Sequence, residues 1–377
     1  MDKTDILIIG AGAVGLAIAA ELADRFPNRS IVLLERYQKF GQETSSRNSG
    51  VIHAGIYYPK GSLKARLCVE GNRLMYDFCS KWEVPCKRTG KLIVANTDEE
   101  IATIESLIIH GRENGVDDLQ LLDSSEVAQY EPNINASAAI YSPSSGIVDS
   151  HQLMSRLEWL AGQKKTIMAY QHEVIRIEPE EKAHTVFYRG PEGQQDSIES
   201  TWLINSAGLS SDSIASLMGI DIDKAGYRLF PCKGEYFSIP YSKSKLIFHL
   251  IYPPPFKDLR GLGIHVTKFL DGMVKLGPNA FFVDEPDYTV NPDHATEFYN
   301  SVKGYLPFLE AEDLQPDMAG VRPKLQAPGS PLRDFVVCHE TGRDLKGVIN
   351  LIGIESPGFT SCLSLAGMVG DIIESGG

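Results

Sequence analysis

A glycine pattern near the start of the chain, Gly10-x-Gly12-x-x-Gly15, constrains the fold more than any other feature. It follows a short, β-branched apolar run at residues 6–9 and opens an alanine-rich stretch typical of a helix. In such a strand–turn–helix unit, Gly10 permits a tight turn, Gly12 lets the backbone approach a pyrophosphate, and Gly15 lets the helix pack closely on the strand. The pattern predicts a dinucleotide site with its phosphates at a helix N-terminus.

The next apolar run supports the same interpretation. Residues 31–34 are expected to form a second buried strand. Glu35 follows at its end, about 20 residues after Gly15, where an acid accepts hydrogen bonds from the adenosine ribose hydroxyls. The alternative, a glycine-rich turn without a ligand, does not require this combination of strands, helix and acid. The fingerprint alone does not separate NAD from FAD.

Composition limits the classes of partner. The chain has 377 residues, which favours two domains or one large interleaved body. Its formal net charge is −13 and it contains no block of lysines or arginines, so nucleic-acid binding is disfavoured. A small anionic ligand would therefore need a locally positive pocket inside an acidic protein.

Cysteine usage and hydropathy indicate the compartment. The 6 cysteines lack the paired spacing of a zinc site, which favours reduced thiols and no metal centre. No apolar run of about 18 residues is present, and the N-terminus enters the glycine motif without a basic leader. We expect a cytoplasmic protein, and leave open a peripheral contact with the cytoplasmic side of a membrane.

Further segments carry a family resemblance. "ETSSRNSG" at 43–50, "WLINSAGLSSD" at 202–212 and "GVINLIGIESPGFTSCLSLAGMVGD" at 347–371 resemble the FAD-dependent oxidoreductases of the D-amino-acid oxidase and glycine oxidase superfamily. Within it, "NSGVIHAGIYYPKGSLKARLCVEGNRLMYDFC" at 48–79, "TGKLIVA" at 89–95 and "AGVRPKL" at 319–325 resemble the L-2-hydroxyglutarate dehydrogenase or oxidase family. The resemblance covers nearly the whole chain and implies a flavoprotein enzyme with FAD as its cofactor.

The resemblance also implies the architecture. We expect an α/β fold, with a Rossmann-like FAD-binding domain and a second, mainly antiparallel β-sheet substrate domain, as in glycine oxidase. The FAD-binding domain would comprise residues 1–80, 145–220 and 335–377, and the substrate-binding domain residues 81–144 and 221–334. Local patterns predict helices at 99–114, 150–161 and 294–305, a strand at 173–177, and an antiparallel sheet within 227–282.

The fingerprint and the resemblance together imply which residues hold FAD. The loop at 45–49 is expected to run under the pyrophosphate and ribityl chain, where Arg47 offsets negative charge; the alternative is a solvated turn. The glycine-rich turn before the last helix is expected to direct N–H groups at the N1–C2 edge of the flavin. The predicted cofactor residues are Gly10, Gly12, Gly15, Glu35, Ser45, Ser46, Arg47, Asn48, Ser49, Val174, Ala207, Gly208, Gly353, Gly358, Phe359 and Thr360.

Two histidines are candidate catalytic bases. His53 falls just past the 45–49 loop, where the resemblance places the reactive side of the flavin. A neutral imidazole there can take the hydroxyl proton of a 2-hydroxy acid. His265 lies on the predicted substrate sheet and is the second candidate. The alternatives for His53 are a structural role or a covalent tether to the flavin, as in some amine-oxidising relatives; for His265 the alternative is a core or lining role.

A dianionic substrate needs at least two positive or hydrogen-bonding anchors. Arg322 is our first choice, because its segment resembles the superfamily position where an arginine meets a carboxylate. Lys233 is another candidate, at a position where the family pattern favours arginine, and Tyr58 and Tyr252 are candidate phenolic donors. The alternatives are surface ion pairs for Arg322 and Lys233, and core packing for both tyrosines.

The resemblance implies a specific reaction. It is the FAD-dependent oxidation of L-2-hydroxyglutarate to 2-oxoglutarate, with a hydride moving from C2 to flavin N5 and with a quinone or oxygen as the final electron acceptor. One alternative is a related flavoenzyme that oxidises an amino acid, a secondary amine or glycerol 3-phosphate. An alternative of another class is a flavin-binding protein without turnover.

Overall fold

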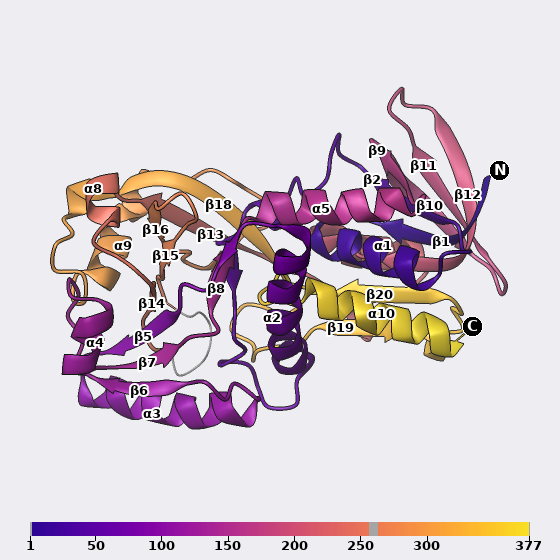
Figure 1. Ribbon diagram of the computed structural model, residues 1–377. Coiled ribbons are helices and arrows are strands. Elements are labelled where there is room, and N and C mark those ends of the chain that lie inside the picture. Colours follow the sequence, from indigo (N-terminus) through magenta and orange to yellow (C-terminus); the bar gives the residue numbers. More distant parts are fainter. Residues whose placement is uncertain (1, 256–262, 377) are drawn as a thin grey trace.

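The computed structural model describes residues 2–255 and 263–376. Its two main β-sheets lie at opposite ends of an elongated molecule, and helix α2 (Leu63–Trp82) stands between them (Figure 1). Both ends of the chain lie at the far end of the same sheet (Figure 1). The first and last segments of the sequence therefore build one body.

The first sheet has eight strands and is parallel at its centre. Its strands are β1 (Asp2–Ile9), β2 (Ile31–Glu35), β9 (Ile167–Tyr170), β10 (Glu173–Pro179), β11 (His184–Arg189), β12 (Gln195–Asn205), β19 (Val336–His339) and β20 (Val348–Ile352). The parallel part has the order β20-β12-β1-β2-β9, while β10, β11 and β19 pair in antiparallel fashion. Because Ile9 pairs with both Asn205 and Leu34, the carboxyl ends of β1, β12 and β2 meet at one edge.

Both faces of this sheet are buried, which explains its continuous apolar strands. The side chains of β1 point alternately to the two faces of the sheet. Ile6 and Ile8 belong to the core on one face, and Leu7 and Ile9 belong to the core on the other. Helices α1 (Ala13–Arg25), α5 (Ser150–Gln163), α10 (Cys362–Gly376) and α2 cover the first core, and α1 packs against α5 and α10 (Figure 1). Helix α6 (Ser211–Leu217) covers the second core.

Within the described residues, the second sheet has nine strands and is mainly antiparallel. Its strands are β5 (Lys91–Ala95), β6 (Gln120–Asp123), β7 (Ala138–Ser142), β13 (Phe230–Ser238), β14 (Leu250–Tyr252), β15 (Val266–Lys268), β16 (Val274–Leu276), β17 (Phe281–Phe282) and β18 (Gln315–Lys324). The order is β17-β13-β16-β15-β14-β5-β7-β6, with β18 also paired to β13. β14 and β5 pair in parallel, whereas the other neighbours are antiparallel.

This sheet also buries both of its faces. Leu92 and Val94 of β5 belong to the core that contains α9 (Ala295–Val302). Ile93 and Ala95 belong to the core beneath α3 (Asp98–Glu113). Since side chains alternate along a strand, Lys91, the first residue of β5, shares the α3 face.

A small antiparallel sheet lies between the two larger ones. Its central strand β8 (Gly146–Val148) pairs with β3 (Val51–Ile52) and β4 (Cys86–Lys87). The remaining elements are α4 (Ser124–Tyr130), α7 (Ile222–Ala225), α8 (Tyr241–Ser244), η1 (Thr44–Ser46), η2 (Gly208–Ser210), η3 (Pro292–His294), η4 (Ala311–Asp313) and η5 (Glu340–Arg343), where η marks a 3-10 turn.

The expected fold class is confirmed, and so are the helices predicted at 99–114, 150–161 and 294–305, the last as the shorter α9. The antiparallel sheet predicted within 227–282 needs a correction, because β14 pairs in parallel with β5 and β18 joins β13. These partners are distant in sequence, and local periodicity does not report them. Residues 256–262 of that segment lie outside the described residues.

The two-domain division stays a prediction that the strand distribution supports. All strands of the first sheet fall within 1–80, 145–220 and 335–377, and all strands of the second within 81–144 and 221–334. Among the helices of the described residues, none has both the length and the apolar character needed to cross a membrane.

Candidate active site

A large cavity lies where the two main sheets meet. Its volume is about 1430 Å³, against roughly 300–1,000 Å³ for a typical small-molecule site. It begins at the carboxyl ends of β1 and β2, where Gly12 and Glu35 line it, and it reaches β14 and β18, where Tyr252 and Arg322 line it. Open α/β sheets bind ligands at this edge. The cavity therefore suits a long dinucleotide with one end directed at the second sheet.

The turn after β1 has the backbone conformation expected of a phosphate cradle. Gly10 has a φ of +102°, which favours glycine, and its N–H donates to the Leu34 carbonyl at 2.8 Å. The N-cap residue of helix α1, Gly12, has no side chain to cap the helix, and the first helical residues, Ala13 and Val14, line the cavity. The positive end of the helix dipole therefore faces any anion bound there.

Glu35 is held at the end of β2 by two backbone N–H groups. Its Oε2 accepts a hydrogen bond from Ala11 at 2.8 Å, and its Oε1 accepts one from Tyr37 at 2.9 Å. Burial raises the pKa of Glu35, although both hydrogen bonds act to lower it. Each carboxylate oxygen keeps a further lone pair, so the fixed carboxylate can still accept ribose hydroxyls.

Gly15 lies outside the cavity lining and acts through packing. A Cβ at this position would lie 1.9 Å from the Gly10 carbonyl oxygen and 2.7 Å from Ser206 Oγ. We expect Gly15→Ala to push α1 away from β1, and so to lower both the FAD content and the melting temperature of the protein. Flavin absorbance per protein and thermal unfolding measure the two effects.

Gly367→Ala is the matched control for this substitution. Gly367 lies inside α10, and an added Cβ would have no neighbouring atom within 4 Å. It should keep its flavin and gain stability, by about 0.5–1 kcal/mol, because alanine is the better helix former. A Gly15→Ala protein with full flavin content and unchanged melting temperature would contradict the packing argument.

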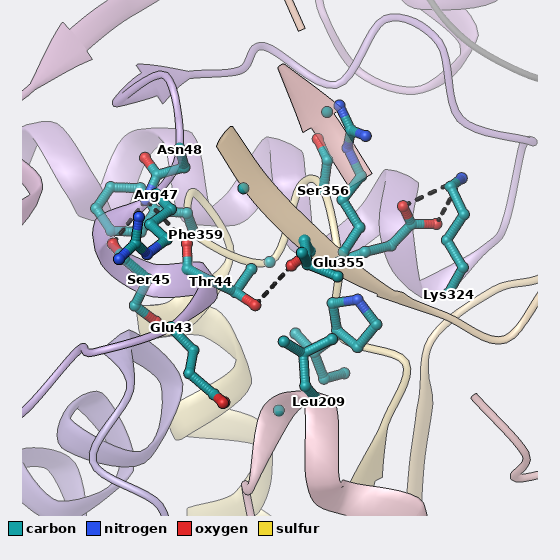
Figure 2. A pocket seen from close by; sticks show the side chains of 18 of the residues that line it. Glu43, Thr44, Ser45, Arg47, Asn48, Leu209, Lys324, Glu355, Ser356 and Phe359 are labelled. Carbon is teal, nitrogen blue, oxygen red and sulfur yellow. Dashed lines mark hydrogen bonds and ion pairs between the residues drawn. The ribbon is translucent and has the colours of Figure 1, made fainter. Parts of the chain in front are cut away.

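The 43–50 loop contributes a group of neighbouring side chains to the cavity wall (Figure 2). Ser45 Oγ accepts a hydrogen bond from the Ala13 N–H at 3.0 Å. Thr44 Oγ1 donates to the Val321 carbonyl at 2.8 Å, drawn as a dashed line in Figure 2. The loop thus bridges the start of α1 to β18, and its shape depends on both main sheets.

Arg47 is the cation of this loop. Its guanidinium carbon lies 4.1 Å from the centre of the Tyr288 ring, and its Nε is buried with no hydrogen-bond partner among the described residues. Asn48 and Ser49 line the cavity beside it. Ser46 does not line the cavity; it is exposed, and its hydroxyl donates to a backbone carbonyl of the same loop.

The remaining predicted cofactor residues divide into two groups. Those that line the cavity are Val174, Ala207, Gly208, Gly358 and Phe359. Gly353 and Thr360 lie behind the lining. Thr360 is fully buried, and its Oγ1 accepts a hydrogen bond from the His53 N–H at 3.1 Å and donates to the Val51 carbonyl at 3.2 Å. Thr360 therefore positions the segment that carries His53.

His53 is fixed through its backbone and lines the cavity with its ring. Its carbonyl accepts a hydrogen bond from Asn72 Nδ2 at 3.0 Å, opposite the contact of its N–H with Thr360. Nδ1 is buried with no hydrogen-bond partner in the described part of the chain. Burial, and after it the positive charge of Lys91, lower the pKa of His53 to about 3. The imidazole is therefore neutral at physiological pH and can accept a proton.

His265 reaches the same cavity from the second sheet. It is 7% exposed, and its ring stacks on Tyr252 with 3.6 Å between ring centres and 12° between ring planes. The stack fixes the orientation of the imidazole. The cavity thus brings both predicted bases together.

Three of the four predicted substrate anchors, Arg322, Tyr58 and Tyr252, line this cavity, but Lys233 does not. The amine of Lys233 pairs with Asp287 and, at 3.3 Å, with Glu235. The reason is strand register: Cys232 lies opposite Arg322, so Lys233 projects from the other face of the sheet.

Sequence analysis missed a buried charge cluster formed by Lys64, Glu355 and Lys324, all of which line the cavity. Lys64 Nζ lies 2.8 Å from Glu355 Oε1. Lys324 Nζ lies 3.2 Å from Glu355 Oε2, and Figure 2 shows this pair. Burial acts to raise the pKa of Glu355, but attraction by Lys64, Lys324 and Arg322 outweighs it and lowers this pKa to about 2. The spacing of Lys324, two residues after Arg322 on one strand, was a usable signal; Lys64 and Glu355 meet only through the fold.

The residues that line the cavity at the carboxyl ends of β1 and β2 fit the phosphate and ribose parts of FAD. The glycine turn, the start of α1 facing the cavity and the acid at Glu35 match the needs of a pyrophosphate and a ribose. The orphaned Nε of Arg47 offers a donor along the same wall. At the other end, the orphaned Nδ1 of His53 marks the place where polar atoms of a ligand are expected.

Comparison with known proteins agrees with this fit. The model of the FAD dependent oxidoreductase family matches residues 5–372. The L-alpha-glycerophosphate oxidase of Mycoplasma pneumoniae, solved with FAD bound, is similar at a TM-score of 0.87 and 26% identity, over 99% of this chain and 95% of that one. Glycine oxidase from Geobacillus kaustophilus has the same fold, with a TM-score of 0.80, 19% identity, and coverage of 100% and 96%.

Relatives with higher sequence identity assign the chain to a smaller family. The mitochondrial L-2-hydroxyglutarate dehydrogenase of Arabidopsis thaliana is 36% identical over 97% of this chain and 82% of its own length. The L-2-hydroxyglutarate dehydrogenase of Escherichia coli is 31% identical over 96% and 91%. The expected cofactor, FAD, is confirmed by the family match. The chain therefore belongs to the FAD dependent oxidoreductases and, within them, to the L-2-hydroxyglutarate dehydrogenase family.

Proposed function

We propose that the protein oxidises L-2-hydroxyglutarate to 2-oxoglutarate. The names of its relatives support this substrate, since those from Arabidopsis thaliana and Escherichia coli are L-2-hydroxyglutarate dehydrogenases. The observation that carries the proposal in this chain is a surplus of positive charge at the substrate end of the cavity. It lies within a protein whose formal net charge is −13.

The surplus follows from a count of charges. Lys64 and Lys324 share the single carboxylate of Glu355, which leaves one positive charge. Arg322 adds another, because its guanidinium contacts the Asn279 carbonyl at 3.4 Å and pairs with no carboxylate among the described residues. In this cluster three cations less one anion leave a charge of two, which equals the charge of a dicarboxylate. The other carboxylates at this end of the cavity lie on α3 and α9 and are not part of the cluster: Glu99, Glu100 and Glu297. Glycine or proline, with one carboxylate and a cationic amine, would leave the surplus uncompensated.

The two kinds of cation suit two separate carboxylates. The planar fork of Arg322 can form two parallel hydrogen bonds with one carboxylate, and we assign it to the carboxylate beside C2. Lys64 and Lys324 act as point charges held in place by Glu355, and we assign them to the distal carboxylate. Tyr58 and Tyr252 line the space between and add phenolic donors.

His53 is the proposed base. Its neutral imidazole takes the proton of the C2 hydroxyl, which leaves the C2 hydrogen to depart as a hydride. Bound FAD supplies the hydride acceptor, N5 of its ring. Asn72 and Thr360 hold the backbone of His53, so the ring keeps its place as substrate enters. His265, stacked on Tyr252, is the second candidate for this role.

Anaerobic mixing with substrate tests the proposal directly. L-2-Hydroxyglutarate should bleach the visible flavin absorbance of the holoprotein, because hydride transfer reduces the ring. D-2-Hydroxyglutarate has the same charges and is the matched control for stereochemistry, while lactate, which lacks the distal carboxylate, is the control for the lysine pair. Both should bleach the flavin far more slowly. Full flavin content with no bleaching by any 2-hydroxy acid would instead favour a flavin-binding protein without turnover.

A second candidate substrate is glycerol 3-phosphate. The solved structure with 26% identity is a glycerophosphate oxidase, and a phosphate dianion also matches a surplus of two charges. The same bleaching experiment separates the two candidates. Reduction by glycerol 3-phosphate but not by L-2-hydroxyglutarate would assign the cations to one phosphate.

The electron acceptor and the compartment also stay proposals. We propose a quinone or oxygen as the acceptor that reoxidises the flavin. All cysteines in the structure are free thiols, which supports a reducing compartment such as the cytoplasm. The relatives from Arabidopsis thaliana and Homo sapiens are named as mitochondrial.

A further inference from the structure

Asp334 lies outside the cavity lining but holds the start of the helix that carries Lys64. Its Oδ2 accepts a hydrogen bond from the Leu63 N–H at 2.6 Å, and its Oδ1 accepts one from the Lys64 N–H at 3.0 Å. Leu63 and Lys64 are the first two residues of α2. A carboxylate at a helix N-terminus also interacts favourably with the helix dipole. Asp334 therefore fixes the backbone from which the Lys64 side chain extends.

The N-cap of α2 is a different residue. Ser62 occupies that position, and its Oγ accepts a hydrogen bond from the Ala65 N–H at 3.1 Å. In an exposed helix, water can satisfy the other N–H groups of the first turn. Here two of them are bound by Asp334, which follows Lys64 by 270 positions in the chain. The contact thus couples two segments that are distant in sequence.

The segment that carries Asp334 also meets the other end of the Lys64 side chain. Phe335 is 4% exposed, and the Lys64 amine lies 5.2 Å from the centre of its ring. An ammonium group is attracted to an aromatic face at about this distance. The ion-pair partner of the same amine is Glu355. Two adjacent residues, Asp334 and Phe335, therefore hold the backbone and the amine of one buried lysine.

This segment is continuous with the strand that carries the other two cations of the cavity. Strand β18 contains Arg322 and ends at Lys324, and residues 325–335 lead from it to β19. The hydrogen bonds of Asp334 therefore tie the start of α2 to the stretch of chain that carries both cations. The place of Lys64 relative to them depends on this tie.

We propose that Asp334 is a positioning residue for substrate specificity, because it holds Lys64 where its amine meets the distal carboxylate of the substrate. The inference rests on the proposed function, in which Lys64 and Lys324 bind that carboxylate. Asp334 lies behind the cavity wall and acts through Lys64 alone. Its loss should therefore weaken the binding of ligands with two carboxylates and spare that of ligands with one.

Binding of two unreactive acids to the oxidised holoprotein tests this role without turnover. Glutarate has both carboxylates of 2-hydroxyglutarate, butyrate lacks the distal one, and neither has a hydroxyl group to oxidise. Perturbation of the flavin absorbance measures their dissociation constants. In Asp334→Ala the dissociation constant of glutarate should rise about tenfold, less than the ~10²-fold that misplacing a group by about 1 Å can cost. The dissociation constant of butyrate should stay unchanged.

Ser62→Ala is the matched control, because it removes a cap from the same helix and leaves the contacts of Asp334 in place. Both variants should lower the melting temperature, since each leaves N–H groups at the start of α2 without a partner. Only Asp334→Ala should change the ratio of glutarate to butyrate affinity. Asp334→Asn keeps one carbonyl acceptor and should give an intermediate ratio, and it carries the same comparison if Asp334→Ala loses its flavin.

A double-mutant cycle tests whether Asp334 acts through Lys64. Lys64→Met removes the amine, so adding Asp334→Ala to it should raise the dissociation constant of glutarate by no more than about twofold. With L-2-hydroxyglutarate, Asp334→Ala should raise the concentration for half-maximal flavin reduction about tenfold and leave the limiting rate unchanged. The limiting rate stays because His53 and Arg322 keep their places.

Three results would overturn the inference. One is equal glutarate binding by the wild-type, Asp334→Ala and Asp334→Asn holoproteins. Another is an equal loss in Ser62→Ala, because any damage to the helix end would then suffice. The third is full additivity of Asp334→Ala and Lys64→Met, because Asp334 would then act by another route. If L-2-hydroxyglutarate does not reduce the flavin but glutarate binding depends on Asp334 as described, the proposed function fails while the positioning role stands.

Discussion

Replacing His53 with alanine should slow anaerobic flavin reduction by L-2-hydroxyglutarate by about 10²–10⁴-fold, the usual contribution of a positioned general base. The flavin should stay bound, because the contacts that hold this segment use the backbone of His53. Its N–H donates to Thr360 and its carbonyl accepts from Asn72, and alanine keeps both. Rapid mixing measures the reduction rate, and absorbance of the purified protein measures flavin content.

His265→Ala is the matched comparison, since His265 lines the same cavity and is also a candidate base. Its ring stacks on Tyr252, so alanine should loosen that tyrosine and reduce the rate only modestly. A large loss in His265→Ala with a small loss in His53→Ala would reverse our assignment. Equal, large losses with full flavin content would indicate that both imidazoles act in one proton path.

Replacing Arg322 with methionine should lower kcat/KM, because the transition state would lose about 2–5 kcal/mol of stabilisation. This is the typical cost of truncating one member of a buried charge pair. This equals a loss of about thirtyfold or more, at about 1.4 kcal/mol for each factor of ten. The reason is that the substrate carboxylate would lose its paired N–H donors, while Arg47, the other cavity arginine without an ion pair among the described residues, lies against Tyr288 in the 43–50 loop. Steady-state kinetics across substrate concentrations measures the effect. Arg322→Lys should recover only part of it, because an amine cannot form the fork.

Lys233→Met is the control that separates an anchor from a structural ion pair. Lys233 projects from the opposite face of the sheet to Arg322, and its partners are Glu235 and Asp287. We expect unchanged KM for L-2-hydroxyglutarate and a lower melting temperature, because the buried carboxylate of Glu235 would lose one cation. An increase of KM similar to that of Arg322→Met would show that Lys233 does meet the substrate.

The cofactor end of the site was predictable from local sequence because its chemistry is local. Gly10, Gly12 and Glu35 lie in one β–α–β unit, where each residue acts through the backbone conformation or strand end that the sequence itself encodes. Ser46 shows the limit of this reasoning. A run of hydroxyl residues predicts a polar loop, but the turn at Thr44–Ser46 directs Ser45 to α1 and leaves Ser46 in solvent.

The substrate end was less predictable because it depends on strand register. The two strands that pair at Arg322 carry Lys233 and Lys324, and sequence analysis selected Lys233 as an anchor and did not select Lys324. On one strand Lys324 shares the face of Arg322, and on the neighbouring strand Lys233 takes the opposite face. A shift of one residue in the pairing of β13 with β18 would place Lys233 on the same face as Arg322. No local sequence pattern indicates which of the two registers forms.

By itself, the sequence predicted the dinucleotide cradle, indicated the family and determined the residue types available for catalysis, because these depend on short contiguous motifs. Only the tertiary structure decided which charges act together. Lys64, Lys324 and Glu355 come from three distant segments, and they meet only in the folded protein. The physical reason is that the energy of a charge depends on its distance from other charges and on its burial, and both quantities exist only after the chain has folded.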